Sequence, residues 1–215
     1  MNQKTKLYQT AFLLAIVTII FNILEGLVSV FMGVKDETLT LFGFGADSFI
    51  EVLSGIGIAH MLIRIRNNGN EDKDEFENRA LKITGFSFYA LSAGLTLTII
   101  YNLLTGQKPI TTSWGVIISL VSMLMMWILM REKLKVGRTL NSPSIVADAN
   151  CSKVCLYMSG VLLISSAAYE LTHIAYIDLL GTAGIIWLSV NEGRECFEKV
   201  RNNTVCACGQ DKCKV

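Results

Sequence analysis

Charge is scarce and unevenly spread in this sequence of 215 residues. Charged residues make up only 17% of the chain, proline and histidine occur twice each, and the charges gather in short segments between long apolar runs. These segments are too short to form a soluble domain, and no nucleotide-binding motif is present, which argues against ATP-driven chemistry. What is abundant is apolar: 52% of the residues are hydrophobic. The composition indicates an integral membrane protein.

Six apolar windows have the length of about 20 residues that crosses roughly 30 Å of hydrocarbon. The first, AFLLAIVTIIFNILEGLVSVFMG, is too long for the apolar core of a signal peptide and has no clear cleavage site, so we expect it to remain as a span. We therefore predict an all-α, multi-pass protein of the cell membrane with six transmembrane helices. The windows lie near residues 9–33, 41–65, 83–105, 113–131, 144–170 and 175–193.

The lysines and arginines predict the orientation of these spans. All but three of the nineteen fall on one side of the predicted membrane, since only Lys35 and Lys108 lie in the opposite loops and Lys153 lies within a span. Basic residues concentrate on the cytoplasmic side of membrane proteins. We therefore expect both termini to be cytoplasmic, which agrees with an even number of spans. The formal net charge of +1 gives no indication of a nucleic-acid partner.

The connections between spans suggest two regions, a six-helix transmembrane domain over residues 1–199 and a cysteine-rich cytoplasmic tail over residues 200–215. The polar segments RNNGNEDKDEFENRA and REKLKVGRTLNSPS are interpreted as cytoplasmic loops. In the second of them, Ser142 and Pro143 are suited to begin the fifth helix as cap and first-turn residue.

Two pairs of side chains within spans are candidates for metal ligands. Asp47 and Glu51 in the second span, and Cys151 and Cys155 in the fifth, are each four residues apart, which places both members of a pair on one helix face. The two spans run in opposite directions, so their inner faces can meet near the midplane, where transporters often hold substrates. Ionisable groups at that depth mark functional sites. Two carboxylates and two thiols match one tetrahedral cation of the zinc type or softer.

Charge limits this arrangement, because two carboxylates and two thiolates leave a formal excess of two negative charges around a divalent ion. A thiol that stays protonated, a nearby Lys153, or fewer simultaneous ligands would each reduce the excess. Asp148 lies one turn before Cys151. We assign it a secondary role at the cytoplasmic entrance.

Other polar residues have simpler interpretations. Paired cysteines are also common as small buried hydrophobic residues, and Asn22 and Glu25 are equally explained by hydrogen bonding between helices. His60 and His173 have no partner at ligand spacing. All six cysteines lie in the membrane or on the inner side, where thiols are usually reduced. The tail cysteines either form a capture or sensing site or are incidental: Cys206, Cys208 and Cys213.

Three segments resemble the cation diffusion facilitator (cation efflux) family of six-span transporters. GADSFIEVLSGIG is similar to that family's second span with its Asp-x3-Asp motif, and VGRTLNSPSIVADANCSKVC to its basic loop and fifth span. IDLLGTAGIIWLSVNEGRE resembles the sixth span, in which Asp178 would open the helix. The resemblance implies a metal site, a homodimer and proton antiport. The chain looks like a short form without the family's C-terminal soluble domain, for which the cysteine tail would substitute.

The resemblance and the residues together predict a transporter, not an enzyme, with no prosthetic group. The expected activity is export of a divalent heavy-metal cation from the cytoplasm by proton antiport, with zinc as the first expectation. The family's histidine and aspartate of the fifth span are cysteines here, which favours a softer ion such as cadmium. The alternatives are a membrane metal sensor or scaffold and a membrane thiol oxidoreductase, although the spacing of Cys151 and Cys155 is unsuited to a disulfide.

Overall fold

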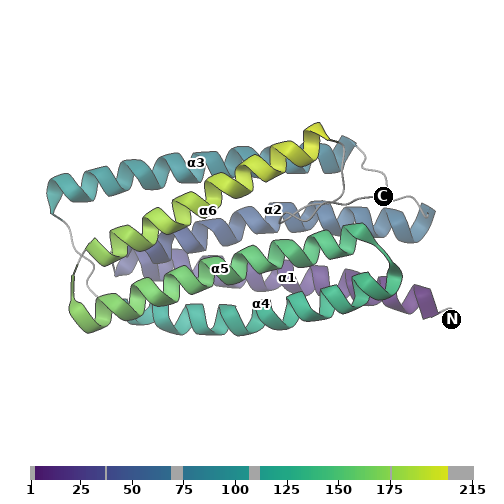
Figure 1. Cartoon of the computed structure of the whole chain (residues 1–215), viewed down its shortest axis with the longest axis horizontal. Coiled ribbons are helices and arrows are strands. Elements are labelled where there is room, and N and C mark those ends of the chain that lie inside the picture. The colour runs from purple at the N-terminus through teal and green to yellow at the C-terminus, as the bar shows by residue number, and fades with distance from the viewer. Residues whose placement is uncertain (1–2, 37, 69–74, 107–111, 175, 203–215) are drawn as a thin grey trace.

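The computed structural model describes residues 3–36, 38–68, 75–106, 112–174 and 176–202, and these form a bundle of six long helices (Figure 1). Within those ranges there is no strand, so the all-α prediction is confirmed. The helices are α1 (Gln3–Lys35), α2 (Leu39–Asn68), α3 (Glu75–Thr105), α4 (Ser113–Leu140), α5 (Pro143–Thr172) and α6 (Tyr176–Arg201).

The helices have the size and surface of membrane-spanning elements. Large apolar side chains such as Leu104, Leu171 and Ile164 are largely exposed on the bundle surface, as lipid contact requires. Helix α6 carries charges near its C-terminal end, yet its 26 residues reach about 39 Å. Within the described residues, five helices are long and apolar enough to cross a membrane by length and composition, over Lys6–Lys35, Leu39–Asn67, Asn78–Thr105, Ser113–Leu140 and Asp148–Thr172.

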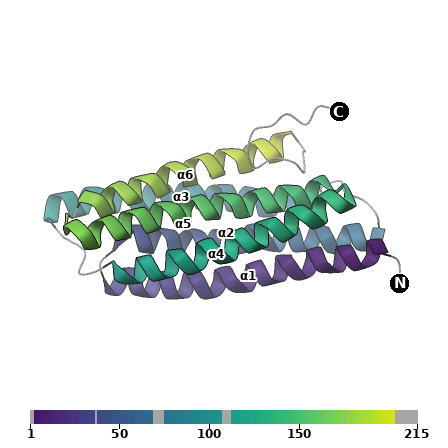
Figure 2. The same ribbon diagram turned by 60° about the horizontal axis from the view of Figure 1, so that its bottom comes forward.

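The bundle is built from three closely packed helix pairs, α1 with α2, α4 with α5, and α3 with α6 (Figures 1 and 2). Consecutive helices run in opposite directions, so the start of α1 and the end of α6 lie at the same end of the bundle (Figure 1). The basic residues of the α2, α4 and α6 ends also lie there. We call this the cytoplasmic end, following the distribution of lysine and arginine, and the other the outer end.

The second cytoplasmic loop is shorter than the sequence predicts, because α4 continues through REKLKVGRTL to Leu140. Lys133, Val136 and Gly137 extend the buried face of the helix against α5, and a side chain at Gly137 would meet the backbone of Val146 at 3.1 Å. The helix ends at Asn141, whose φ of 50° is the left-handed conformation that asparagine tolerates. Ser142 then occupies the N-cap position of α5 and Pro143 its first turn, as predicted, but the Ser142 side chain makes no capping hydrogen bond.

The first cytoplasmic segment is also partly helical, since α2 runs to Asn68 and α3 begins at Glu75. The cysteines of the predicted tail, Cys206, Cys208 and Cys213, lie outside the described residues.

A polar contact and an apolar cluster hold the outer end together. Asp178, in the first turn of α6, is 2% exposed and accepts hydrogen bonds from the backbone N–H groups of Leu39 at 2.9 Å and Thr40 at 3.3 Å. It thus caps α2 as well as opening α6, because a carboxylate stabilises the unpaired N–H groups of a helix start. Next to this contact lies a core from α2 to α6: Leu41, Phe44, Leu95, Ile118, Met158, Leu162 and Ile185.

Candidate functional site

The cytoplasmic half of the bundle is hollow. A cavity of about 90 Å³ lies among all six helices, and its lining runs from the middle of the bundle toward the cytoplasmic end. Polar and charged side chains face it from all six helices, which is unusual for a membrane interior. These are Thr18, Asn22, Asp47, Glu51, Ser54, Thr84, Lys133, Asp148, Ser152, Cys155, Glu192, Cys196 and Lys199.

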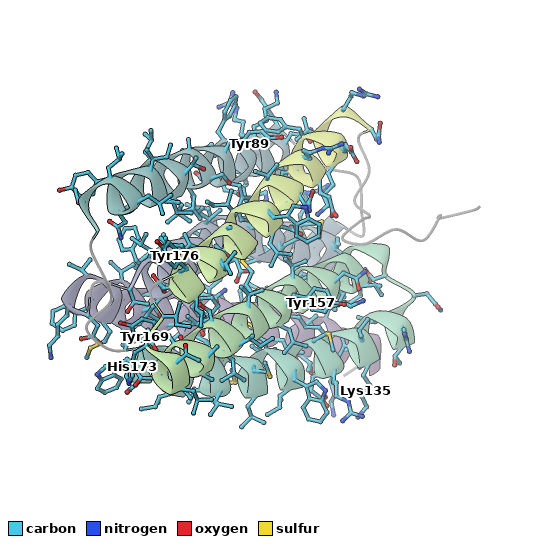
Figure 3. The ribbon with its side chains drawn as sticks, turned by 60° about the vertical axis from the view of Figure 1, so that its left-hand side comes forward. Tyr89, Lys135, Tyr157, Tyr169, His173 and Tyr176 are labelled. Carbon is cyan, nitrogen blue, oxygen red and sulfur yellow. The ribbon has the colours of Figure 1, made fainter. Side chains whose placement is uncertain are left out.

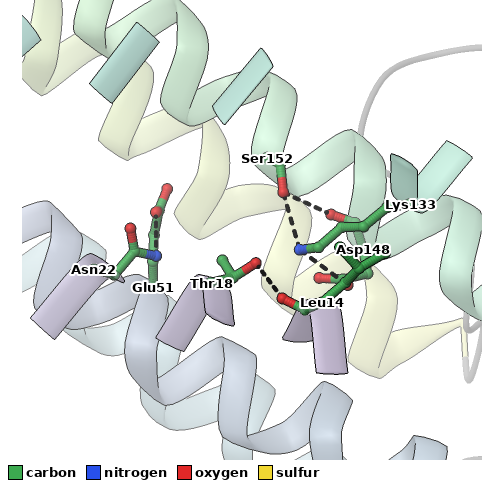
Figure 4. A network of polar contacts seen from close by, with 7 residues as sticks. All are labelled: Leu14, Thr18, Asn22, Glu51, Lys133, Asp148 and Ser152. Atoms are coloured by element: carbon green, nitrogen blue, oxygen red, sulfur yellow. Dashed lines mark hydrogen bonds and ion pairs between the residues drawn. The ribbon is translucent and has the colours of Figure 1, made fainter. Parts of the chain in front are cut away.

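The two predicted acids of α2 share the wall of this cavity, one helical turn apart. Asp47 is 2% exposed, and its Oδ1 atom has no hydrogen-bond partner among the residues that the structure describes. Glu51 is half-buried, and its Oε2 atom accepts a hydrogen bond of 3.0 Å from Nδ2 of Asn22 on α1 (Figure 4). The acids therefore present oxygens to the cavity, one without a donor and one held in place.

Helix α5 brings a thiol to the same place. Cys155 is buried, lines the cavity, and donates a hydrogen bond from Sγ to Oε1 of Glu51. The thiol and the carboxylate come from residues 104 positions apart, so the contact depends on the register of α2 against α5. Cys151 lies one turn earlier on α5, but its side chain is outside the described part of the structure. The structure thus brings together one acid and one thiol of the two predicted pairs, with Asp47 on the same wall.

No group of three or more histidine, cysteine, aspartate or glutamate side chains within the described ranges is placed to hold a metal ion together. Glu51 and Cys155 touch, and Asp47 faces the cavity beside them. Convergence of all four predicted residues on one cation therefore stays a prediction, with Cys151 as the undescribed member.

A buried ion pair occupies the cytoplasmic part of the cavity. Lys133 on α4 is 1% exposed, and its Nζ atom lies 3.1 Å from Oδ2 of Asp148 and 3.1 Å from Oγ of Ser152, both on α5 (Figure 4). The sequence prediction missed Lys133, because it placed this residue in a loop beyond the fourth span. The continued spacing of Met126, Leu129 and Lys133 along one helix face is the signal that identifies it.

Lys153 does not compensate the acids as the sequence suggested. Its side chain is exposed, and its Nζ atom lies 5.7 Å from the ring centre of Tyr157 on the same helix. Residues two apart on a helix do not share a face. The lysine between Cys151 and Cys155 therefore points away from the cavity wall that Cys155 lines.

Three other polar residues that the sequence singled out do not line the cavity: Glu25, His60 and His173. Glu25 on α1 is 8% exposed and accepts a hydrogen bond of 3.1 Å from Ser48, the neighbour of Asp47. His60 packs on Phe76 with 4.5 Å between ring centres, and His173 lies 5.9 Å from Tyr169 at the outer end of α5 (Figure 3). Neither histidine lines the cavity.

Helix α6 contributes residues that the sequence did not assign to this site. Glu192, Cys196 and Lys199 follow one face of α6 into the cytoplasmic part of the cavity. Cys196 is 4% exposed and lies within α6, so its thiol is part of the bundle interior.

The family model for the cation efflux transmembrane domain matches residues 12–201. The chain therefore belongs to the cation efflux family, whose members are membrane transporters and not enzymes. The match covers all six helices almost completely, so the whole bundle and its cavity form one cation-transport domain in the membrane. A comparison with curated proteins gives no match.

Proposed function

We propose that the protein is a secondary transporter that exports a divalent heavy-metal ion from the cytoplasm, zinc or a softer ion such as cadmium, in exchange for protons. The proposed ligands are Asp47 and Glu51 of α2 and Cys151 and Cys155 of α5. Asp148 has a secondary role on the cytoplasmic side. The family resemblance further leads us to propose a homodimer.

The observation that carries this proposal is the contact between the Cys155 thiol and the Glu51 carboxylate inside the cavity. A thiol and a carboxylate from two antiparallel helices offer a mixed sulfur and oxygen donor set. Hard cations such as magnesium prefer oxygen alone, whereas zinc accepts both donors and softer ions favour sulfur. The cysteines therefore support a zinc-like or softer cargo.

The same contact supports exchange with protons. Sγ of Cys155 donates its proton to Glu51, and a metal ion binds cysteine as thiolate. Metal binding at this pair therefore expels a proton, and a proton that returns from outside favours metal release. Because the cavity lies in the cytoplasmic half and the outer half is packed, the conformation suits loading from the cytoplasm.

Transport into vesicles of the reconstituted protein tests this proposal. Cys155→Ala and Asp47→Asn should each lower the rate of zinc or cadmium uptake at least about 100-fold, since each removes a ligand of a four-ligand site. Cys196→Ala is the matched control, because it removes a buried thiol from the same cavity that we do not propose as a ligand. Equal loss in all three variants, with folding intact, would contradict the assignment.

The preferred metal ion and the exchange of metal for protons are measured in the same vesicles. Fluxes of zinc, cadmium, mercury, copper(I) and iron(II) should rank the thiophilic ions and zinc above iron(II), and a pH dye inside should report proton movement against metal. A protein in which only replacement of Cys206, Cys208 and Cys213 alters a metal response is the sensor alternative. Disulfide exchange with a quinone, without metal flux, is the oxidoreductase alternative.

A further inference from the structure

A lysine within the cavity of a cation transporter requires a physical reason. Lys133 is almost fully buried, and its ammonium group lines the cavity that the cation must enter. It repels any metal ion there, and a buried lysine is costly in a membrane. An apolar residue of the same size packs at least as well as a buried ion pair. Stability therefore does not account for a positive charge at this position.

The partners of Lys133 indicate what its charge does. Nζ lies 3.1 Å from Oδ2 of Asp148, and Oγ of Ser152 accepts a second hydrogen bond at 3.1 Å. Ser152 in turn donates to the backbone oxygen of Asp148 at 3.4 Å. The ammonium is thus fixed against one carboxylate of the lining instead of reaching to the cytoplasm, as a long lysine side chain at a helix end usually does.

The charges of the cavity lining show the consequence of this pair. The acids that face the cavity are Asp47, Glu51, Asp148 and Glu192, and the bases are Lys133 and Lys199. Lys199 lies 4.0 Å from Glu195 on its own helix, so its charge already has a partner on α6. With Lys133 neutralising Asp148, the carboxylates of Asp47, Glu51 and Glu192 are the acids of the lining that remain to attract a cation. Each thiolate formed on metal binding adds to the negative excess.

We propose that Lys133 sets the charge of the cavity by neutralising Asp148, and so adjusts its affinity to one divalent cation that can still leave. The inference rests on the proposed function. Without Lys133, the carboxylate of Asp148 adds one further negative charge to the cavity. The metal then binds more tightly and leaves more slowly, and Asp148 becomes available to a second ion.

The size of the effect follows from the distance along α5. Asp148 precedes Cys155 by seven residues, about 10 Å along the helix axis. Adding or removing one charge at that distance from a divalent ion changes affinity by roughly tenfold or more at the effective dielectric constant of a protein interior. The change is large enough to measure and has a sign that a purely structural ion pair does not share.

The experiment compares Lys133→Met, Asp148→Asn and the double variant in the full chain with Cys206, Cys208 and Cys213 replaced by serine. Cadmium and zinc binding to the purified protein is measured by calorimetry, with metal content by mass spectrometry. We expect affinity to rise about tenfold or more in Lys133→Met and to fall by a similar factor in Asp148→Asn. The double variant, which restores the charge, should return to within about threefold of the parent.

A purely structural pair predicts a different pattern. Lys133→Met would then weaken binding or leave it unchanged, and the double variant would not return to the affinity of the parent; either result overturns the inference. Should a single variant not fold, Lys133→Arg and the double variant decide, since both keep the net charge and should bind like the parent. If the parent binds neither metal, the proposed function fails. If it binds one ion and the variants do not differ from it, only the role of Lys133 fails.

Discussion

The two ends of the bundle satisfy their buried polar groups in different ways. At the outer end, Asp178 caps α2, Thr40 and Thr182 share a hydrogen bond of 3.1 Å, and the hydroxyl of Thr112 donates to the backbone oxygen of Ser166 at 2.8 Å. In the cytoplasmic half, the described residues leave Oδ1 of Asp47 and Oγ1 of Thr84 without a partner beside the cavity. The described residues also leave Oδ2 of Asp36 and Oγ of Ser166 without a partner at the outer end. The difference is that the unpartnered atoms of Asp47 and Thr84 belong to residues that line the cavity, whereas Asp36 and Ser166 do not line it.

This difference indicates that the outer end contributes mainly to the stability of the bundle and the cavity mainly to ligand binding. Matched hydrogen bonds and close packing contribute to stability, whereas unmatched polar atoms at a cavity cost stability and are characteristic of sites that bind a ligand. An exporter in this conformation is closed on the outside and can receive its cargo from the cytoplasm. Substitutions at the outer end should therefore change stability, and substitutions around the cavity should change binding.

The largest effect is expected at Asp178. Asp178→Ala removes the acceptor of two backbone N–H groups at the start of α2, and hydrogen bonds to a charged group contribute about 1.5 to 3 kcal/mol each. The variant should lose about 3 kcal/mol or more of unfolding free energy, seen as an earlier thermal transition by circular dichroism in detergent. Asp178→Asn retains one acceptor and should lose less. A melting temperature of Asp178→Ala equal to that of the parent would show that the contact of Asp178 with α2 does not contribute to the stability of the bundle.

Glycine substitutions test the close packing of the outer end. A side chain at Gly33 on α1 would meet the backbone nitrogen of Phe42 at 2.6 Å, and that backbone cannot move aside. Gly33→Ala should cost roughly 1 to 3 kcal/mol. Gly94→Ala on α3 is the matched control, because nothing lies within 4 Å of the added carbon. The control should be neutral or slightly stabilising, as alanine favours helix. Similar melting curves for the two variants would refute close contact of α1 and α2.

The cavity side is tested at Asn22. Its amide donates to Oε2 of Glu51 at 3.0 Å, so Asn22→Leu should leave stability nearly unchanged and lower metal affinity about tenfold, as loss of a group that orients a ligand does. Thr18→Val is the control, since Thr18 lines the same cavity but bonds the backbone oxygen of Leu14 in its own helix at 2.8 Å. Binding isotherms and thermal unfolding separate the two effects. A large loss of stability in Asn22→Leu with normal metal affinity would mean that Asn22 stabilises the fold and does not orient Glu51 for metal binding.

The smallest effect is expected from two threonines. Thr182→Val removes a hydroxyl that bonds Thr40 at 3.1 Å and the backbone of Asp178 at 2.8 Å, and should cost about 1 kcal/mol. Thr84→Val removes a buried hydroxyl without a partner in the described residues, and should cost nothing or stabilise slightly. Denaturation of both variants side by side measures the difference. A greater loss in Thr84→Val would mean that its hydroxyl is satisfied after all.

The sequence predicted the features that depend on one helix at a time. Spacing alone places Asp47 and Glu51 on one face, and apolar length identifies the spans. It did not predict that Asn22 holds Glu51 or that Asp178 caps α2, because these contacts depend on how helices lie against each other. Lys133 lies beyond the apolar window of the fourth span, because the window ends at charged residues, although the buried face of α4 continues through Lys133.

Lys153 is a charge that the sequence offers to the cavity but that does not lie there. It lies between the two cysteines in the sequence, whereas helical geometry turns its side chain away from the cavity wall that Cys155 lines. The residue that does neutralise an acid comes from another helix. Nearness along the chain is a poor guide to charge pairing within a bundle.

X-ray absorption at the zinc edge tests directly whether carboxylates of α2 and thiols of α5 bind the same ion. The full chain, with the three tail cysteines replaced by serine and Cys196 by alanine, is loaded with one equivalent of zinc. We expect a shell of mixed oxygen and sulfur, with zinc to sulfur at about 2.3 Å. Its sulfur component should decrease in Cys155→Ala, and its oxygen component should decrease in Asp47→Asn. A shell without sulfur in the parent would contradict this expectation.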